Sequence, residues 1–181
     1  RFVGVDFHSI KIPELFKIDV THLSALPLFA QKIKEICSDF ENSCIVSPDM
    51  GGLRRTGLLK DELGVDMDVV AVEKNRDTKS GDISASGIHG NVKEVCFIVD
   101  DMISSGKTLV QCMEELKKAG GKQFFVFVTH GVFSKDAHET LQNSDAEKVF
   151  ITDSIETKPE MQSEKLEILS LSPLISSVLS A

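Results

Sequence analysis

The sequence predicts an α/β fold, in which a mainly parallel, twisted β-sheet carries helices on both faces. Short, continuously apolar segments alternate along the chain with segments whose apolar residues recur at helical spacing. A strand that is apolar throughout, rather than at every second position, is typical of a sheet that is covered on both faces. In such sheets ligands bind outside the carboxyl ends of the strands, so the residues after each predicted strand are candidates for a site.

The apolar segments give the positions of the predicted strands and helices. The predicted strands are Cys44–Val46, Val69–Val72, Val95–Val99, Phe124–Val128 and Val149–Ile151. The clearest helix is predicted over Lys107–Ala119, because its apolar residues share one face and Gly120-Gly121 follows as a C-terminal signal. Two further helices are predicted from apolar stripes, one of Phe29, Ile33, Ile36 and Cys37, the other of Leu53, Leu58, Leu59 and Leu63 before Gly64.

Composition indicates a soluble, globular, single domain over residues 1–181. The formal net charge of −8 lacks the basic excess of a nucleic-acid-binding surface, and no apolar run is long enough to span a bilayer. We therefore expect no nucleic-acid partner, no membrane partner and a cytoplasmic location. The cysteines form no C-x-x-C pair, so we expect reduced core residues and neither a disulfide nor a zinc framework. They are Cys37, Cys44, Cys96 and Cys112.

One segment, V-C-F-I-V-D-D-M-I-S-S-G-K-T-L-V at residues 95–110, ends in the Gly-Lys-Thr of an ATP-binding P-loop. A P-loop also needs a glycine five residues before the Gly-Lys pair, and Asp101 occupies that position. A carboxylate there repels the anion, so the P-loop interpretation fails. The remaining pattern is a strand, the small residues Ser104-Ser105-Gly106 and the start of a helix, whose free N–H groups bind anions.

Asp100 and Asp101 end the predicted strand directly before this loop. Two carboxylates beside a phosphate site suit a sugar phosphate, because they accept hydrogen bonds from ribose hydroxyls while the loop holds the phosphate. The alternative is that one of them only caps the helix. Lys107 either contacts the phosphate or points into solvent.

A second turn with small residues, S-P-D-M-G-G at residues 47–52, follows another predicted strand. Asp49 is a candidate for a metal-bridged phosphate, and an ordinary turn is the alternative. Asp6 and His8 alternate in a strand-like run, so we expect them on one face; His8 is a candidate ligand or a structural histidine. We expect His130, at the end of a strand, to be structural.

The segment Glu73–Gly90 is polar, rich in glycine and serine, and lacks sustained periodicity. A long connection without regular structure in a compact domain is typical of a functional lid or of a solvated excursion. We expect a mobile lid loop over residues 73–90, because Lys74 and Arg76 place two cations at its base.

The segment I-V-D-D-M-I-S-S-G-K-T resembles the ribose-phosphate-binding signature of proteins with the type I phosphoribosyltransferase fold. The order of the surrounding motifs resembles one branch of them, the ribose-phosphate pyrophosphokinases. The matching segments are V-D-F-H-S-I-K-I-P-E-L-F (5–16), I-V-S-P-D-M-G-G (45–52), E-K-N-R (73–76), residues 95–108, V-T-H-G-V-F-S (128–134) and I-T-D-S-I (151–155).

This resemblance implies an enzyme that transfers diphosphate from Mg-ATP to the 1-hydroxyl of ribose 5-phosphate and releases AMP. It implies that Ser104, Ser105, Gly106, Lys107 and Thr108 hold the 5-phosphate and that Asp100 and Asp101 hold the ribose hydroxyls. His8 and Asp49 would lie at the Mg²⁺ end, and the catalytic Lys74 and Arg76 would close over the transferring phosphates. Transfer of this kind depends on positioning and charge neutralisation.

The same resemblance implies a homo-oligomer and a further N-terminal domain that supplies most of the ATP-base pocket. We therefore expect this chain to be the C-terminal, ribose-5-phosphate-binding part of a longer two-domain protein, inactive when isolated. Many relatives carry an acid at the position of Ser104 and a glycine at that of Lys107. Two alternatives stay open: a phosphoribosyltransferase that uses phosphoribosyl pyrophosphate, and a non-catalytic regulatory relative.

Overall fold

The computed structural model describes residues 1–9, 11–76, 83–134 and 136–179, and for residues 74–76 and 83–86 it describes the backbone only. The strands are β1 (Phe2–Val5), β2 (Val20–Leu23), β3 (Ser43–Ser47), β4 (Asp68–Arg76), β5 (Ile83–His89), β6 (Val95–Ile103), β7 (Gln123–Gly131), β8 (Ala146–Thr152) and β9 (Leu166–Leu169). The α-helices are α1 (Leu26–Ile36), α2 (Leu53–Leu63), α3 (Lys107–Lys118), α4 (Ala137–Gln142) and α5 (Ser172–Leu179). Short 3₁₀ helices are η1 (Ile12–Leu15), η2 (Met50–Gly52) and η3 (Pro159–Met161).

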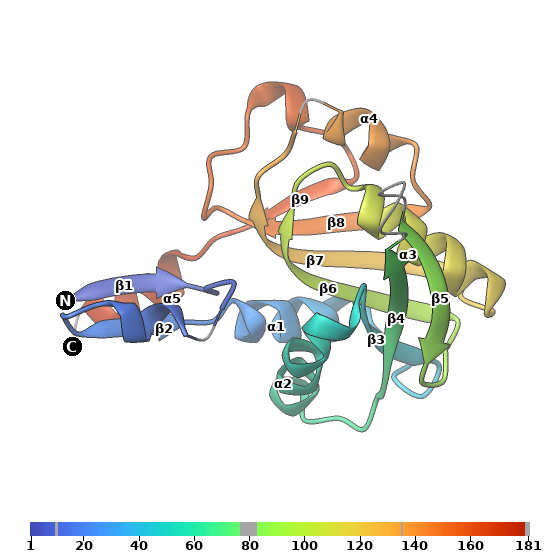
Figure 1. Ribbon diagram of the computed structural model, residues 1–181, viewed down its shortest axis with the longest axis horizontal. Helices are drawn as coiled ribbons and strands as arrows, with labels where there is room; N and C mark the ends of the chain where they lie inside the picture. The colour runs from blue at the N-terminus through green and yellow to red at the C-terminus, as the bar shows by residue number, and fades with distance from the viewer. Residues whose placement is uncertain (10, 77–82, 135, 180–181) are drawn as a thin grey trace.

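Within the described residues, seven strands form one sheet in the order β5-β4-β3-β6-β7-β8-β9 (Figure 1). Neighbouring strands are parallel throughout, except that β5 runs antiparallel to β4 at one edge. Each of the five strands predicted from the apolar runs lies inside an observed strand of this sheet. The predicted α/β class with a mainly parallel sheet is therefore confirmed.

The central strands are apolar throughout because both faces of the sheet are buried. In β6, Cys96 and Ile98 belong to the core on the face covered by α3, whereas Phe97 and Val99 belong to the core on the face covered by α1 and α2. On the second face, the rings of Phe127 and Phe150 stack with their centroids 4.6 Å apart. The alternation of side chains along a strand thus fills two cores from one apolar run.

The helix predictions are confirmed in position and corrected in detail. The helix α3 places its predicted apolar stripe in the core, and α2 ends at Gly64, whose φ of +64° is the left-handed conformation of a C-terminal glycine. On α2, Leu59 and Leu63 are buried, but Leu53 and Leu58 are exposed, so its buried face is narrower than predicted. On the first predicted stripe, Ile36 is also exposed.

The four cysteines are free thiols. As predicted, Cys44, Cys96 and Cys112 are buried core residues, and Cys37 is half-buried. No helix in the described ranges has both the length and the apolar character that crossing a membrane requires.

The expectation of an irregular connection over residues 73–90 is wrong for much of that segment. Glu73–Arg76 continues β4, and Ile83–His89 forms β5, so the two strands make an antiparallel pair with an irregularity between Glu73 and Lys74. Residues 77–82 lie outside the described residues. Ser84, Ser86 and Gly87 give β5 little apolar character, which is sufficient for an edge strand but gives no strand signal in the sequence.

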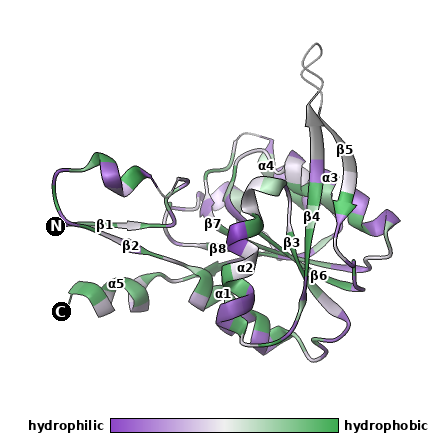
Figure 2. Ribbon diagram, turned by 60° about the horizontal axis from the view of Figure 1, so that its bottom comes forward, coloured by the Kyte–Doolittle hydropathy of each residue, from purple (hydrophilic) through white to green (hydrophobic). Residues whose placement is uncertain are grey.

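The N-terminal strands β1 and β2 form a separate two-stranded parallel sheet, which lies with α5 beside the main sheet (Figure 1). Arg1 donates a hydrogen bond to the carbonyl of Val178, which links this small sheet to α5. None of the α5 residues is buried, although the helix is largely hydrophobic in Figure 2.

The order of the strands determines where a ligand site is expected. From β3 the chain proceeds outward to β4 and β5, and from β6 it proceeds in the opposite direction to β7, β8 and β9. The reversal lies between β3 and β6, and ligands of open α/β sheets bind at the carboxyl ends of the strands at such a reversal.

Candidate functional site

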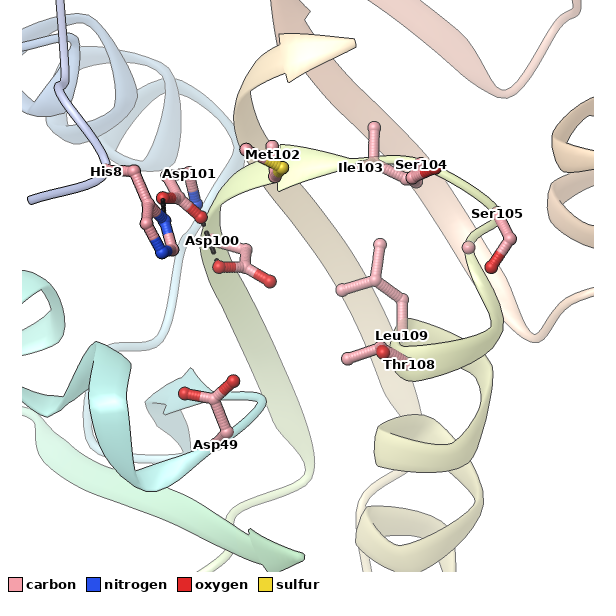
Figure 3. A pocket seen from close by; sticks show the side chains of 11 residues that line it. His8, Asp49, Asp100, Asp101, Met102, Ile103, Ser104, Ser105, Thr108 and Leu109 are labelled. Atoms are coloured by element: carbon pink, nitrogen blue, oxygen red, sulfur yellow. Dashed lines mark hydrogen bonds and ion pairs between the residues drawn. The ribbon is translucent and has the colours of Figure 1, made fainter. Parts of the chain in front are cut away.

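A cavity of about 580 Å³ lies at the carboxyl ends of β3 and β6, at this reversal (Figure 3). One wall carries Asp49, which follows β3, and the other is formed by Asp100 to Gly106 and by Thr108. Carboxylates gather at one end, and the small residues of the loop lie at the other end. Most of the site residues predicted from separate motifs therefore meet in one cavity, namely His8, Asp49, Asp100, Asp101, Ser104, Ser105, Gly106 and Thr108.

The loop after β6 turns sharply at Gly106, whose φ is +77°. A β-carbon there would lie 3.3 Å from Cγ2 of Thr140. Residues other than glycine also rarely adopt this positive φ, so the turn favours glycine at this position. Gly106 is the N-cap of α3 and has no side chain that caps the first N–H groups of the helix. The N–H of Lys107 makes a long, 3.4 Å hydrogen bond to Ser105 Oγ, and the positive end of the helix still suits an anion.

Asp100 and Asp101 lie inside β6 and not after its end, because the strand continues to Ile103 through pairing with His130 and Gly131 of β7. The backbone N–H of Asp101 donates a hydrogen bond of 2.9 Å to Oδ1 of Asp100. Their side chains are mostly buried, with 19% and 8% of the surface exposed. The alternative that one of them caps α3 is excluded, since Gly106 occupies the cap.

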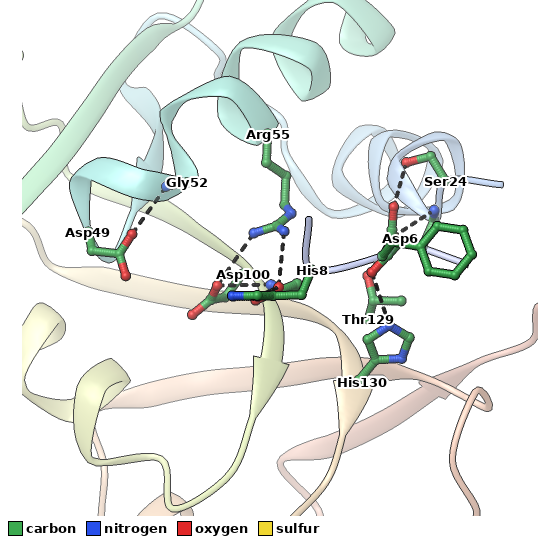
Figure 4. A network of polar contacts seen from close by, with 12 residues as sticks. Asp6, His8, Ser24, Asp49, Gly52, Arg55, Asp100, Thr129 and His130 are labelled. Carbon is green, nitrogen blue, oxygen red and sulfur yellow. Dashed lines mark hydrogen bonds and ion pairs between the residues drawn. The ribbon is translucent and has the colours of Figure 1, made fainter. Parts of the chain in front are cut away.

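Arg55 of α2 forms ion pairs with both acids, at 3.5 Å to Asp100 and 3.4 Å to Asp101 (Figure 4). The sequence reasoning missed this residue. A signal was available, because an arginine in the first turn of a helix faces the positive end of the helix dipole and needs a compensating anion. Arg55 reaches the acids from a second cavity of about 300 Å³, which it lines together with His8.

The two acids differ in their proton affinity. Burial, together with the neighbouring Asp101, raises the pKa of Asp100 to about 7, although Arg55 opposes the shift. Burial also acts to raise the pKa of Asp101, but the hydrogen bond with His8 and the charge of Arg55 outweigh it and hold that pKa below its usual value. Near neutral pH the pair therefore exchanges a proton through Asp100 while Asp101 stays ionised.

His8 lines the cavity, and its Nδ1 lies 2.6 Å from Oδ2 of Asp101. The expectation that Asp6 and His8 share a strand face is wrong, because β1 ends at Val5 and the backbone of Asp6 turns away with a φ of +39°. Asp6 is buried and accepts hydrogen bonds from Ser24 Oγ, the N–H of Ala25 and Thr129 Oγ1. It thus anchors the segment that presents His8.

His130 is structural, as predicted. Its Nδ1 lies 2.9 Å from Ser154 Oγ and its Nε2 lies 3.3 Å from the carbonyl of Asp6 (Figure 4). The ring therefore joins the carboxyl end of β7 to the N-terminal segment.

Asp49 has the turn role that the sequence left open, and its role toward a metal-bridged phosphate stays a prediction. Its Oδ1 accepts a hydrogen bond of 3.1 Å from the N–H of Gly52, so it caps η2, and its side chain also lines the cavity. The part of the chain that the structure describes holds no cluster of three or more His, Cys, Asp or Glu side chains suited to a metal.

A family model described as the phosphoribosyl synthetase-associated domain matches residues 86–180, more than half of the chain. The chain belongs to this family.

Relatives of the phosphoribosyl synthetase-associated domain extend the match to nearly the whole chain. The chain is 37% identical over 177 residues to ribose-phosphate pyrophosphokinase of Corynebacterium glutamicum. It is 38% identical over 176 residues to the ribose-phosphate pyrophosphokinase of Aquifex aeolicus. These alignments cover 97% of this chain and 54% and 55% of the relatives. The crystal structure of phosphoribosylpyrophosphate synthetase from Mycobacterium smegmatis matches with a TM-score of 0.86 and 30% identity, over 99% of this chain and 57% of that one.

The resemblance read from the motifs is thus confirmed. The chain spans about half the length of the curated relatives that it matches.

Three of the residues predicted for this phosphoribosyl synthetase-associated domain are not placed in the cavity. Lys107 is exposed and does not line the cavity, which agrees with its solvent-facing alternative. The backbones of Lys74 and Arg76 lie at the carboxyl end of β4, the strand next to β3. Their side chains lie outside the described residues, so their role stays a prediction.

Proposed function

We propose that the chain is the ribose-5-phosphate-binding part of a ribose-phosphate pyrophosphokinase. In this proposal the enzyme transfers diphosphate from Mg-ATP to the 1-hydroxyl of ribose 5-phosphate, giving phosphoribosyl pyrophosphate and AMP. The relatives that carry this name match 97% of the chain, and the cavity has a form that suits the sugar phosphate.

The observation that carries the proposal is the division of the cavity into two chemically different ends. The loop Ser104–Thr108 offers helix-start N–H groups and small side chains, which suit a phosphate. Asp100 and Asp101 offer carboxylate oxygens, which accept hydrogen bonds from vicinal hydroxyls. A ligand with a phosphate at one end and a diol at the other satisfies both ends together.

Phosphoryl-type transfer needs positioning of the two reactants and neutralisation of the charge on the transferring group. Ser104, Ser105, Gly106 and Thr108 would fix the sugar through its 5-phosphate. Asp100 and Asp101 would orient the ring, so that the 1-hydroxyl faces the donor. Lys74 and Arg76, on the segment after β4, would supply positive charge to the transferring group.

Magnesium fits this arrangement as an ion shared with the substrate. Mg²⁺ usually keeps several waters and binds through one or two carboxylates together with substrate phosphates, so a closed set of protein ligands is not required. Asp49 is an oxygen donor in the cavity wall and suits this ion, whereas His8 is a less usual ligand for it. When bound, Mg²⁺ would neutralise the charge of the donor's phosphates.

The test is an activity assay on a full-length form of the protein. It should convert ribose 5-phosphate and Mg-ATP to AMP and phosphoribosyl pyrophosphate, and ribose without the phosphate should be a far poorer substrate. The 181-residue chain alone should bind ribose 5-phosphate with almost no turnover.

Consumption of phosphoribosyl pyrophosphate with a free base, without AMP formation, would indicate a phosphoribosyltransferase. Binding without turnover in the full-length protein would indicate a regulatory relative.

A further inference from the structure

Asp100 and Asp101 both form ion pairs with Arg55, which lies on α2. In the described part of the chain, no other side chain forms ion pairs with both acids. The two terminal nitrogens of Arg55 are divided between them, NH1 toward Asp100 Oδ1 and NH2 toward Asp101 Oδ2. The side chain is 19% exposed, so solvent screens these ion pairs only in part. A planar guanidinium fixes the direction of both contacts, which a point charge does not.

The two acids need such a contact because they are adjacent and mostly buried. Without a counter-ion, two carboxylates so close together repel each other and separate or take up a proton. The other side chain paired with these acids is His8 at Asp101, but it is 76% exposed and lies on the segment after β1. Among the described residues, Arg55 is the one ion-pair partner of Asp100.

The helix α2 holds Arg55 in place. Thr56, the next residue, is fully buried and donates a hydrogen bond of 2.9 Å to the carbonyl of Leu53, and Leu59 one turn later is also fully buried. Arg55 itself does not line the larger cavity but approaches the acids from the smaller one. The guanidinium therefore supports the carboxylates from behind and leaves their cavity side open to a ligand.

Resting on the function proposed above, we propose that Arg55 is a positioning residue for ribose 5-phosphate. It holds the carboxylates of Asp100 and Asp101 in the arrangement that receives the hydroxyls of the sugar, without touching the phosphate loop. Its removal should weaken recognition of the sugar and leave recognition of the phosphate unchanged.

The experiment compares two probes by isothermal titration calorimetry, ribose 5-phosphate and inorganic phosphate, on the 181-residue chain. In Arg55→Met the affinity for ribose 5-phosphate should fall about tenfold or more, because the hydrogen bonds to the charged acceptors lose their geometry. The affinity for inorganic phosphate should stay at the wild-type value, which also shows that the variant is folded. Arg55→Lys should recover only part of the lost affinity for ribose 5-phosphate. Lysine restores the positive charge but not the planar guanidinium, whose two nitrogens reach the two acids separately.

Arg54→Met is the matched control, since Arg54 precedes Arg55 on α2, is exposed and contacts neither acid in the described residues. It should bind both probes as the wild type does. Equal affinities of Arg55→Met and Arg54→Met for ribose 5-phosphate would overturn the positioning role, and so would an equal loss for both probes in Arg55→Met. If the wild-type chain binds ribose 5-phosphate no more tightly than inorganic phosphate, that result would overturn the proposed function instead.

Discussion

The two turns that face each other across the cavity are built from similar residues but have opposite relations to a ligand. Both follow a parallel strand, contain glycine and lead into a helix. In the turn after β3, Asp49 accepts the hydrogen bond from Gly52, and Ser47 Oγ donates a 2.6 Å hydrogen bond to the carbonyl of Asp49. In the turn after β6, Gly106 at the N-cap of α3 offers no side-chain acceptor, and the N–H of Lys107 makes a long, 3.4 Å hydrogen bond to the neutral hydroxyl of Ser105.

The difference between the turns is the charge near the helix start, which is a carboxylate, Asp49, after β3 and only neutral serine hydroxyls after β6. A carboxylate that caps the turn satisfies a donor and also repels phosphate. We therefore propose that the phosphate binds at the turn after β6 and that the turn after β3 is mainly structural, with Asp49 in the cavity wall. The predictions below test this division, in order of decreasing effect.

The largest effect should come from outside both turns. In an active full-length form, Lys74→Ala should lower kcat by roughly 10²–10³, as does the loss of one preorganised charge contact. The KM for ribose 5-phosphate should change little, because Lys74 is proposed to act on the transferring group alone. Steady-state kinetics separate the two parameters, and an unchanged kcat would remove Lys74 from the mechanism.

Gly106→Ala should abolish most of the phosphate affinity. The substitution places a β-carbon at a φ of +77°, 3.3 Å from Thr140, and strain of about 1–3 kcal/mol must be relieved by moving the loop. Calorimetry with inorganic phosphate measures the loss. Gly51→Ala in the opposite turn is the control, because Gly51 has no positive φ, and its phosphate affinity should stay near that of the wild type. Equal losses in the two variants would contradict the division between the turns.

Asp101→Asn should weaken ribose 5-phosphate binding about tenfold, since a hydrogen bond to a charged group contributes roughly 1.5–3 kcal/mol. Binding of inorganic phosphate should not weaken, because the loop is intact. A parallel loss of both ligands would show that the acid supports the loop and does not recognise the sugar.

Asp100→Asn should change how stability depends on pH. The folded-state pKa of Asp100 is about 7, above the value of about 4 in an unfolded chain. Between these values the unfolded state releases a proton that the folded state keeps, so wild-type stability falls as the pH rises. The free energy of unfolding of Asp100→Asn minus that of the wild type should therefore be larger at pH 8 than at pH 5, which means that the variant gains relative stability.

For each unit of pKa displacement this relative gain is about 1.4 kcal/mol. Urea unfolding at the two pH values measures it. A difference that is independent of pH would show that Asp100 titrates normally.

Asp49→Ala should destabilise the fold by about 1 kcal/mol, the usual contribution of a helix cap. Asp49→Asn keeps an acceptor and should be near the wild type in urea unfolding. Both variants should bind inorganic phosphate normally in the absence of magnesium. A loss of phosphate affinity in Asp49→Ala alone would mean that the turn after β3 takes part in the phosphate site.

Much of this site could be predicted because strand ends and small-residue loops are local patterns. Asp49, Asp100 and the loop Ser104–Gly106 were predicted from the residues that follow apolar runs, and the sheet order places them around one cavity. Arg55 was missed because its partners are 45 and 46 positions away in sequence, and nothing local states which anion it meets. The pairing of His8 with Asp101 is equally long-range.

The strand β5 escaped prediction for a different reason. Its sequence I-S-A-S-G-I-H carries few apolar residues, since it lies at the edge of the sheet and pairs with a single neighbour. Leu53 and Leu58 were predicted on the buried face of a helix, but both are exposed. Apolar residues at helical spacing indicate a buried face only where another element covers them.

The assignment of the phosphate to one turn is tested most directly by backbone amide resonances of the chain during titration with ribose 5-phosphate. The account predicts large shifts for the N–H groups of Ser104–Thr108 and small shifts for those of Met50–Gly52. Inorganic phosphate should reproduce the shifts of the loop without those near Asp100 and Asp101. Large shifts at Met50–Gly52 with an unchanged loop after β6 would contradict the account.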